Sequence, residues 1–191
     1  MDGFWLCFVP LFVAVDAVGV LPMFLGLTEG IDRTRLRLVI WQSLITGILV
    51  AVVFVVIGKG VFRLLGITPA DFMIAGGILL FAISLRDLLV VEKHREPIDP
   101  ESLGAVPVGV PLIVGPAVLT TILILVDQHG ILTTMAAAVV NILLAGVVFG
   151  FARAIALRLG GAGTKAISKI ASLFLAAIAV MMVRKGLLVH L

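Results

Sequence analysis

Apolar residues fill six long stretches of the chain, and short polar connections separate them. The stretches are Phe4–Leu27, Leu38–Ile57, Phe72–Val91, Ala105–Val126, Thr134–Leu157 and Ile167–Val189. Each is close to the ~20 residues that an α-helix needs to cross about 30 Å of hydrocarbon. The pattern predicts an all-α integral membrane protein with six transmembrane segments.

Composition also indicates a chain embedded in a membrane. Of the 191 residues, 62% are hydrophobic and 13% are charged, whereas a soluble domain has about 25% charged residues. Few residues remain outside the six stretches, so no soluble catalytic domain is expected, and the single Cys7 cannot form an internal disulfide. The apolar stretches make the lipid bilayer an expected partner. Nucleic acid is not expected, because no run is both basic and aromatic.

The distribution of Lys and Arg predicts the orientation of the chain. Ten lie in or beside the first, third and fifth connections: Arg33, Arg35, Arg37, Arg86, Lys93, Arg95, Arg153, Arg158, Lys165 and Lys169. Four lie on the opposite side: Lys59, Arg63, Arg184 and Lys185. Since basic connections stay on the cytoplasmic side, both termini are expected to be extracytoplasmic, in a multi-pass protein of the cell inner (plasma) membrane.

The first stretch contains two features that are costly in lipid, an acid and helix-breaking residues. Asp16 near the middle of a bilayer costs about 2.5–3.5 kcal/mol on an insertion scale. Gly19 and Pro22 are expected to interrupt the helix a few residues later, and freed backbone groups must then find partners. Together these features indicate a binding site; the structural alternative is an acid satisfied by a neighbouring helix.

The fourth stretch is broken as well. Val106–Thr121 contains three prolines and two glycines, so it cannot be one continuous helix. Gly115-Pro116 is interpreted as the end of one half-helix and the first position of the next, which proline favours. Thr120 and Thr121 follow one turn later and offer hydroxyl groups.

Smaller motifs have alternative interpretations. The small residues in Ile74–Ile78 favour close helix packing over a bare cavity wall. Asn141 fits interhelical bonding and substrate binding equally well. Gly146–Gly150 can pack within a subunit or between subunits, so a homo-oligomer stays open. Arg158–Lys165 is expected to be a flexible basic connection.

The chain divides into two similar halves, 1–91 and 105–191, joined by a polar cytoplasmic linker, 92–104. Val9-Pro10 corresponds to Val106-Pro107 at an offset of 97 residues. Each half is a broken span followed by two ordinary ones, and three spans per half make the halves cross the membrane in opposite senses. This predicts a 3+3 inverted-topology repeat with discontinuous first and fourth helices, which points to a transporter with its binding site at the bilayer midplane.

Two broken helices suit a zwitterionic substrate. Half-helix N-termini favour a carboxylate, and unwound carbonyls with Asp16 suit an ammonium group or a coupling cation. The candidate substrate- and ion-binding residues are Asp16, Gly19, Pro22, Gly115, Pro116, Thr120, Thr121 and Asn141, with Gln42 as an outside candidate. The sequence has no Ser-His-Asp set or Walker motif, and His94 is interpreted as part of a solvated linker. No enzyme activity, cofactor or metal site is therefore expected.

Several motifs, in order along the chain, resemble the MarC family of six-span membrane proteins. They are Asp16–Pro22 followed by Phe24–Leu27, Ile74–Gly77, Val110–Pro116, Gly160-Gly161 and Ala166–Ser168. The resemblance covers essentially the whole chain. Two positions depart from the family pattern, because Ala17 stands where proline is common and Ala117 where glycine is common.

The resemblance implies transport. The family is similar to LysE-type exporters, and an archaeal member, SnatA, transports small neutral amino acids. It implies a secondary transporter of the glycine or alanine class, working by alternating access and coupled to a proton or another cation through Asp16. One alternative is an exporter of other metabolites or drugs, with a wide apolar cavity and no dependence on Asp16. The other is a non-transporting membrane scaffold with a tightly packed centre.

Overall fold

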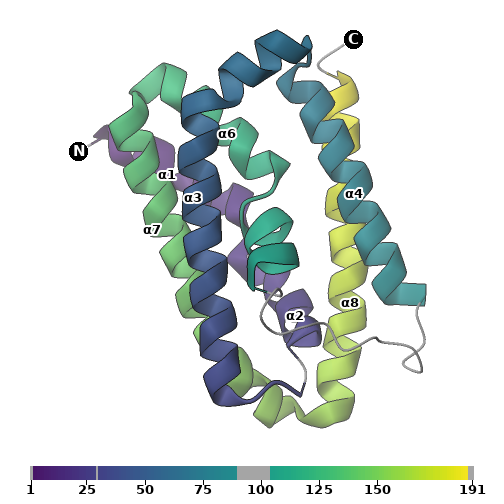
Figure 1. Cartoon of the computed structure of the whole chain (residues 1–191). Coiled ribbons are helices and arrows are strands. Elements are labelled where there is room, and N and C mark those ends of the chain that lie inside the picture. The colour runs from purple at the N-terminus through teal and green to yellow at the C-terminus, as the bar shows by residue number, and fades with distance from the viewer. Residues whose placement is uncertain (1, 29, 90–103, 189–191) are drawn as a thin grey trace.

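A computed structural model of the chain describes residues 2–28, 30–89 and 104–188, and over these it is an all-helical bundle (Figure 1). The elements are α1 (Asp2–Val15), α2 (Ala17–Leu27), α3 (Arg33–Leu65), α4 (Pro69–Leu89), η2 (Gly104–Ile113), α6 (Pro116–His129), α7 (Ile131–Gly150) and α8 (Ala152–Leu188). The predicted linker, apart from its last residue Gly104, lies outside the described residues, and so does His94.

Several of these helices are long and apolar enough to cross a membrane. By length and composition they are Gly3–Leu21, Arg33–Leu65 and Ile131–Gly150, and η2 with α6 makes a fourth span if the bent pair is counted as one. The start of α1 and the end of α8 lie toward the same end of the bundle in Figure 1. The chain is therefore a helical membrane protein, while the six-span inverted repeat and the side on which the termini lie stay predictions.

The helices pack in two groups. α4 and α8 run along each other on one side of the bundle, and α1, α3 and α7 form the other side, with η2 packed against α3 (Figure 1). α2 packs along α8 and so joins the two groups. Contacts also join the part of the chain before residue 90 to the part after residue 103: α1 packs against α6, α3 against α7, and α4 against α8.

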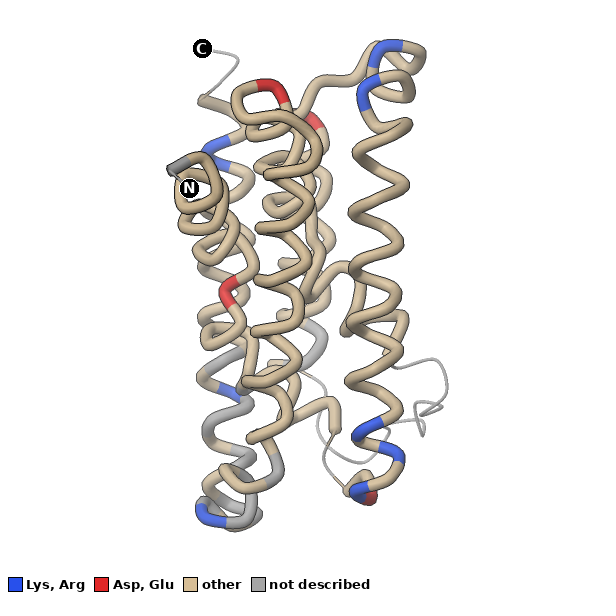
Figure 2. Tube along the Cα trace, turned by 90° about the vertical axis from the view of Figure 1, so that its left-hand side faces the viewer, with Lys and Arg blue, Asp and Glu red and all other residues tan. Residues whose placement is uncertain are grey.

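The surface of the bundle is that of a lipid-facing protein. Large apolar side chains such as Leu49, Val56 and Val147 are exposed along its sides. Lys and Arg gather toward the two ends, while an acidic position lies at mid-height (Figure 2). This separation of charge from the apolar sides is what a bilayer requires, because charged groups are stable only near its two surfaces.

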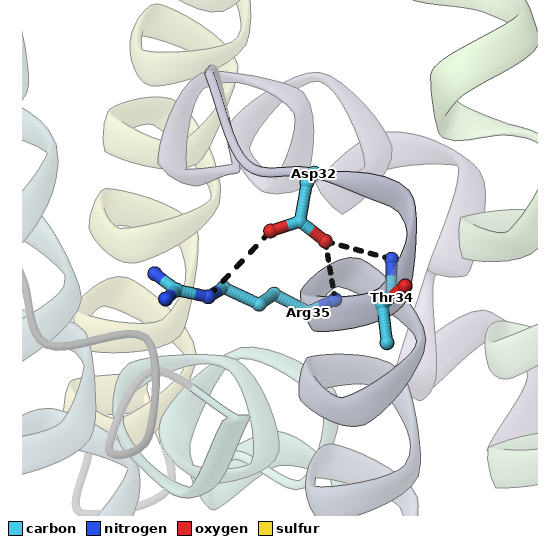
Figure 3. Close-up of polar contacts among 3 residues, drawn as sticks. All are labelled: Asp32, Thr34 and Arg35. Carbon is cyan, nitrogen blue, oxygen red and sulfur yellow. Dashed lines mark hydrogen bonds and ion pairs between the residues drawn. The ribbon is translucent and has the colours of Figure 1, made fainter.

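Side-chain caps start α3 and α4. At α3, Asp32 Oδ1 accepts hydrogen bonds from the backbone N–H groups of Thr34 (2.9 Å) and Arg35 (3.0 Å). Its other oxygen lies 3.5 Å from Nε of Arg35 (Figure 3). At α4, Thr68 and Asp71 bond each other's backbone N–H groups reciprocally, which satisfies donors that a helix start leaves free.

The predicted boundary between the last two spans is wrong. α7 ends at Gly150 rather than Leu157, and α8 already begins at Ala152. The expected flexible connection at Arg158–Lys165 is helical except at Gly160, whose φ of 67° lies in the left-handed region. Hydropathy marks where a chain leaves hydrocarbon, whereas a helix continues past that point when its residues favour it, and a single glycine then supplies the turn.

The glycine motifs serve close packing between helices. A Cβ at Gly77 would lie 2.8 Å from the Ala179 carbonyl oxygen of α8, and one at Gly146 would lie 2.7 Å from a methyl of Leu44 in α3. Gly150 has nothing within 4 Å of such an atom. The packing interpretation of the α4 glycines is therefore correct, and Gly146 packs within the subunit.

Candidate functional site

The first broken helix is interrupted at Asp16. This residue has φ 44° and ψ 49°, in the left-handed region that Asp tolerates better than most side chains. Its Oδ1 accepts a hydrogen bond of 3.0 Å from the backbone N–H of Gly19, so Asp16 caps α2. The expectation that Gly19 and Pro22 make the break is wrong, because both lie inside α2. The break forms where a side chain can satisfy the helix start.

Gly19 leaves room for this cap. A Cβ built on Gly19 would collide with the Asp16 carboxylate and would lie 2.6 Å from its Cγ. Any larger residue at this position must displace the carboxylate that bonds its own N–H group.

We therefore expect Gly19→Ala to lower the free energy of unfolding by about 1 kcal/mol, the usual value of an N-cap. Thermal unfolding of the purified protein in detergent measures this. Gly60→Ala is the matched control, because nothing lies within 4 Å of a Cβ at that helical glycine. Equal unfolding temperatures for the two variants would show that the cap contributes nothing.

The second broken helix is interrupted at Gly115. η2 and α6 meet at a bend of 56°, and Gly115 is extended, with φ −92° and ψ −179°. A Cβ there would lie 2.6 Å from the carbonyl oxygen of Pro111, so the close approach requires glycine. Pro116 occupies the first position of α6, and no side chain caps this helix start among the described residues.

The two breaks differ for a steric reason. A residue before proline is pushed out of helical conformations toward extended ones, as Gly115 is before Pro116. Asp16 precedes Ala17 instead, which leaves it free to adopt the left-handed conformation. Ala17 therefore preserves the interruption but changes its geometry.

η2 is an irregular segment held against a polar face of α3. Val106 and Val110 have extended backbone angles, and the peptide bonds before Pro107 and Pro111 are cis. A Cβ at Gly109 would lie 3.1 Å from the Ser43 carbonyl oxygen, and one at Gly104 would lie 2.6 Å from Gln42 Oε1. The polar residues of α3 thus serve as the surface on which the broken segment packs.

The two breaks open onto one cavity of about 800 Å³. Its walls come from α1 and α2, from the end of η2 with the start of α6, and from α4 and α8. Five predicted site residues line it: Asp16, Gly115, Pro116, Thr120 and Thr121. The tertiary structure therefore brings together residues that are about 100 positions apart in sequence.

The hydroxyl groups of the cavity are in different states. Thr121 Oγ1 donates a hydrogen bond of 2.8 Å to the Ala117 carbonyl oxygen. Thr120 is 7% exposed, and its Oγ1 is buried without a hydrogen-bond partner among the described residues. A buried hydroxyl without a partner is costly, so the Thr120 hydroxyl is available to a ligand only if the cavity wall rearranges to expose it.

Among the described side chains, the remaining candidates do not line the cavity. Asn141 Nδ2 donates to the Phe8 carbonyl oxygen (3.2 Å) and to that of Ala137 (2.9 Å), so it ties α7 to α1. Gly19 acts through the Asp16 cap, and Gln42 faces η2. Pro22 lies in α2, and its side chain is outside the described part of the structure.

Sequence reasoning missed Lys185 and the apolar wall. Lys185 was expected at the outer interface, yet it lines the cavity together with residues of α8 that precede it. The spacing of Leu175, Ile178, Met182 and Lys185 is 3, 4 and 3 residues, which places them on one helix face. This spacing could have indicated a shared helix face in the sequence. It does not single out a face that lines a cavity, because many faces of membrane helices have the same spacing.

No group of three or more His, Cys, Asp or Glu side chains that could hold a metal ion occurs within the described ranges. The polar chemistry of the cavity is therefore that of Asp16, Lys185, two threonines and the start of α6. These groups can hold charges of both signs, and none of them forms a pair of nucleophile and base.

Comparison with known proteins identifies the family. A family model described as MarC family integral membrane protein matches residues 1–191. The chain belongs to the MarC family. A UPF0056 membrane protein of Methanocaldococcus jannaschii is 32% identical over 193 residues, covering 94% of this chain and 84% of that protein. One of Archaeoglobus fulgidus is 32% identical over 202 residues, covering 98% and 93%.

A bacterial relative is similar over the same length. The UPF0056 membrane protein YvbG of Bacillus subtilis is 28% identical over 193 residues, covering 94% of this MarC chain and 92% of its own. No solved structure matches the chain. The family match and the apolar helices together make this an integral membrane protein.

Proposed function

We propose that this MarC protein is a secondary transporter of small neutral amino acids of the glycine and alanine class, in the cell inner membrane, and not an enzyme. The observation that carries the proposal is the single cavity onto which both broken helices open. Paired interrupted helices around a central cavity are the arrangement that secondary transporters use to bind substrates in the membrane.

The two sides of the cavity offer groups for the two ends of a zwitterion. Asp16 uses Oδ1 to cap α2 and is one of the residues that line the cavity, where a substrate ammonium group would bind. Across the cavity, the uncapped start of α6 and the unbonded Thr120 hydroxyl supply donors for a carboxylate. Lys185 adds a positive charge on the α8 side.

The packing around the cavity supports alternating access. The cavity lies beside the N-terminal part of α4 and the C-terminal part of α8, the end that charge distribution assigns to the outside. On the far side of the cavity α2 packs along α8. In the predicted repeat α6 corresponds to α2 and α4 to α8, yet α4 and α6 make a much smaller contact. In the inward-open state the two contacts would exchange roles, with α2 leaving α8 and α6 closing against α4.

Uptake of radiolabelled glycine and alanine into proteoliposomes tests this function, together with a thermal-shift screen against the twenty amino acids. We expect uptake above that of empty liposomes, and a rise in unfolding temperature with neutral amino acids, because a ligand that binds only the folded state stabilises it. Charged amino acids should shift the temperature less. Their side chain adds a third charge to the ammonium and carboxylate groups, and the cavity has only one Asp and one Lys. No shift and no uptake with any amino acid would reject the proposal.

One observation favours a second candidate, an exporter of apolar compounds. The wall of the cavity on α4 and α8 is apolar and wide, as that alternative predicts. An uncharged apolar compound would then shift the unfolding temperature more than any amino acid does, and would do so equally in Asp16→Asn. The same screen therefore decides between the two candidates.

A further inference from the structure

Most of the residues that line the cavity are apolar, on both of its sides. Phe12, Val13 and Val18 belong to α1 and α2, and Ile178 and Met181 belong to α8. An amino acid of the glycine or alanine class is small beside a volume of about 800 Å³. Alone in the cavity, it would leave apolar walls in contact with water, which is unfavourable. The cavity therefore has room for a second, apolar occupant.

The exposed residues among these place an opening of the cavity between α1 and α8. Phe12, Val13 and Val18 line the cavity and are exposed as well, Val13 by 70%, so they lie at its rim. Among the described residues α1 and α8 make little or no contact, whereas α2 packs along α8 (Figure 1). Phe12 and Val13 are in the middle of the apolar span Gly3–Leu21. The opening is therefore at the depth of the hydrocarbon and faces acyl chains.

A basic group lies on the α8 side of this opening. Lys185 lines the cavity, is exposed, and is near the end of α8. It forms no ion pair with another described residue. Asp71 is at the same end of the α4/α8 pair, where a Cβ at Gly186 would lie 2.8 Å from the Ala70 carbonyl oxygen, but its Oδ2 accepts two hydrogen bonds from Thr68. Lys185 is therefore available to an anion at the membrane surface.

Lys185 and the apolar residues that precede it form one side of α8. Ile178, Met181 and Lys185 are spaced by three and four residues, so they share a helix face. Ile178 lies two turns from Lys185, which is about 10 Å along the helix axis. An anion bound at Lys185 and carrying an acyl chain would extend that chain past Met181 and Ile178, in the cavity that Phe12 and Val13 also line.

We infer that the cavity holds one acyl chain of an anionic phospholipid, which enters from the bilayer between α1 and α8, and that Lys185 binds the lipid phosphate. Basic groups between membrane helices attract anionic headgroups, and the chain covers the apolar lining. Asp16 and the start of α6 stay available, so a small amino acid and the lipid can bind together. Lipid binding is measured without transport, so its outcome is separate from that of the proposed function.

The experiment titrates lipids into the purified, delipidated full chain in detergent and follows its unfolding temperature. Dioleoyl phosphatidylglycerol should raise this temperature and bind about fivefold more tightly than dioleoyl phosphatidylcholine, as expected for one Lys near the membrane surface. Glycerol 1-phosphate carries the anion without the chains and should give no shift. Equal stabilisation by the two lipids, or stabilisation by glycerol 1-phosphate alone, would overturn the inference.

Lys185→Gln tests the phosphate contact and should remove the preference for phosphatidylglycerol. Arg63→Gln is the matched control, because Arg63 is an exposed basic residue near the end of α3 that does not line the cavity. It should keep the wild-type preference. An undiminished preference in Lys185→Gln would mean that the headgroup binds elsewhere, and would overturn the inference.

Val13→Trp tests the opening by filling it, and should weaken phosphatidylglycerol binding several-fold. Val147→Trp is the control, because Val147 is an exposed residue of α7 away from the cavity, and it should bind the lipid as the wild type does. Full lipid binding by Val13→Trp would contradict the inference. So would a changed oligomeric state with unchanged lipid binding, since a second copy would then cover the opening. If Val13→Trp fails to fold, Lys185→Gln and the lipid comparison still decide.

Discussion

Asp16→Asn should reduce amino acid transport by roughly tenfold or more. The substitution keeps the local fold, because asparagine also tolerates the left-handed region and its Oδ1 can accept the same bond from the Gly19 N–H group. It removes the negative charge of a residue that lines the cavity. A hydrogen bond to a charged group contributes about 1.5–3 kcal/mol, which corresponds to the expected loss.

Initial uptake rates in proteoliposomes measure this effect. Asp127→Asn is the control, because Asp127 is exposed and pairs with Lys59 outside the cavity, so transport should stay near the wild-type rate. If Asp16→Asn transported at the wild-type rate, Asp16 would serve the fold and not the transport mechanism.

Gly76→Leu should be the most destabilising of these substitutions and should also block transport. A Cβ on Gly76 of α4 would collide with the ring of Pro116 and lie 2.6 Å from its Cβ. Pro116 is rigid and occupies the first position of α6, so it cannot move aside. We expect a loss of about 1–3 kcal/mol in the free energy of unfolding, the usual cost of overpacking.

Gly150→Leu is the control for this variant, because a Cβ at that glycine of α7 meets nothing within 4 Å. Its unfolding temperature in detergent should equal or exceed that of the wild type. In the proposed inward-open state the small contact between α4 and α6 becomes a close one. A leucine side chain at Gly76 would keep these two helices apart, so it should reduce both transport and stability. A Gly76→Leu protein with wild-type stability and uptake would show that α4 adjusts freely.

Much of the architecture could be predicted from the chain without coordinates. Long apolar stretches specify membrane helices because lipid offers no partner to a polar backbone. Pro111 and Pro116 predicted an interruption of the fourth stretch because proline lacks an N–H group and clashes with the preceding turn. The motifs around Asp16 indicated the family, and the family match confirms it.

Boundaries and exact breaks were harder to predict. Gly19 and Pro22 look like helix breakers, yet both lie in α2, because the Asp16 carboxylate caps that helix one turn earlier. Arg158–Lys165 looks like a polar connection, yet α8 runs through it with a single turn at Gly160. In both places the helix boundary depended on which backbone groups found hydrogen-bond partners in the fold, and not on the helix propensity of the local residues.

The sequence by itself determined a helical membrane protein of the MarC family with interrupted first and fourth stretches, because hydropathy and proline act locally. Only the tertiary structure decided what faces the cavity. It brought Asp16, Thr120 and Lys185 to one cavity and turned Asn141 and Gln42 to other contacts. These relations depend on how helices far apart in sequence pack, and every apolar face of a membrane helix looks alike until its neighbour is known.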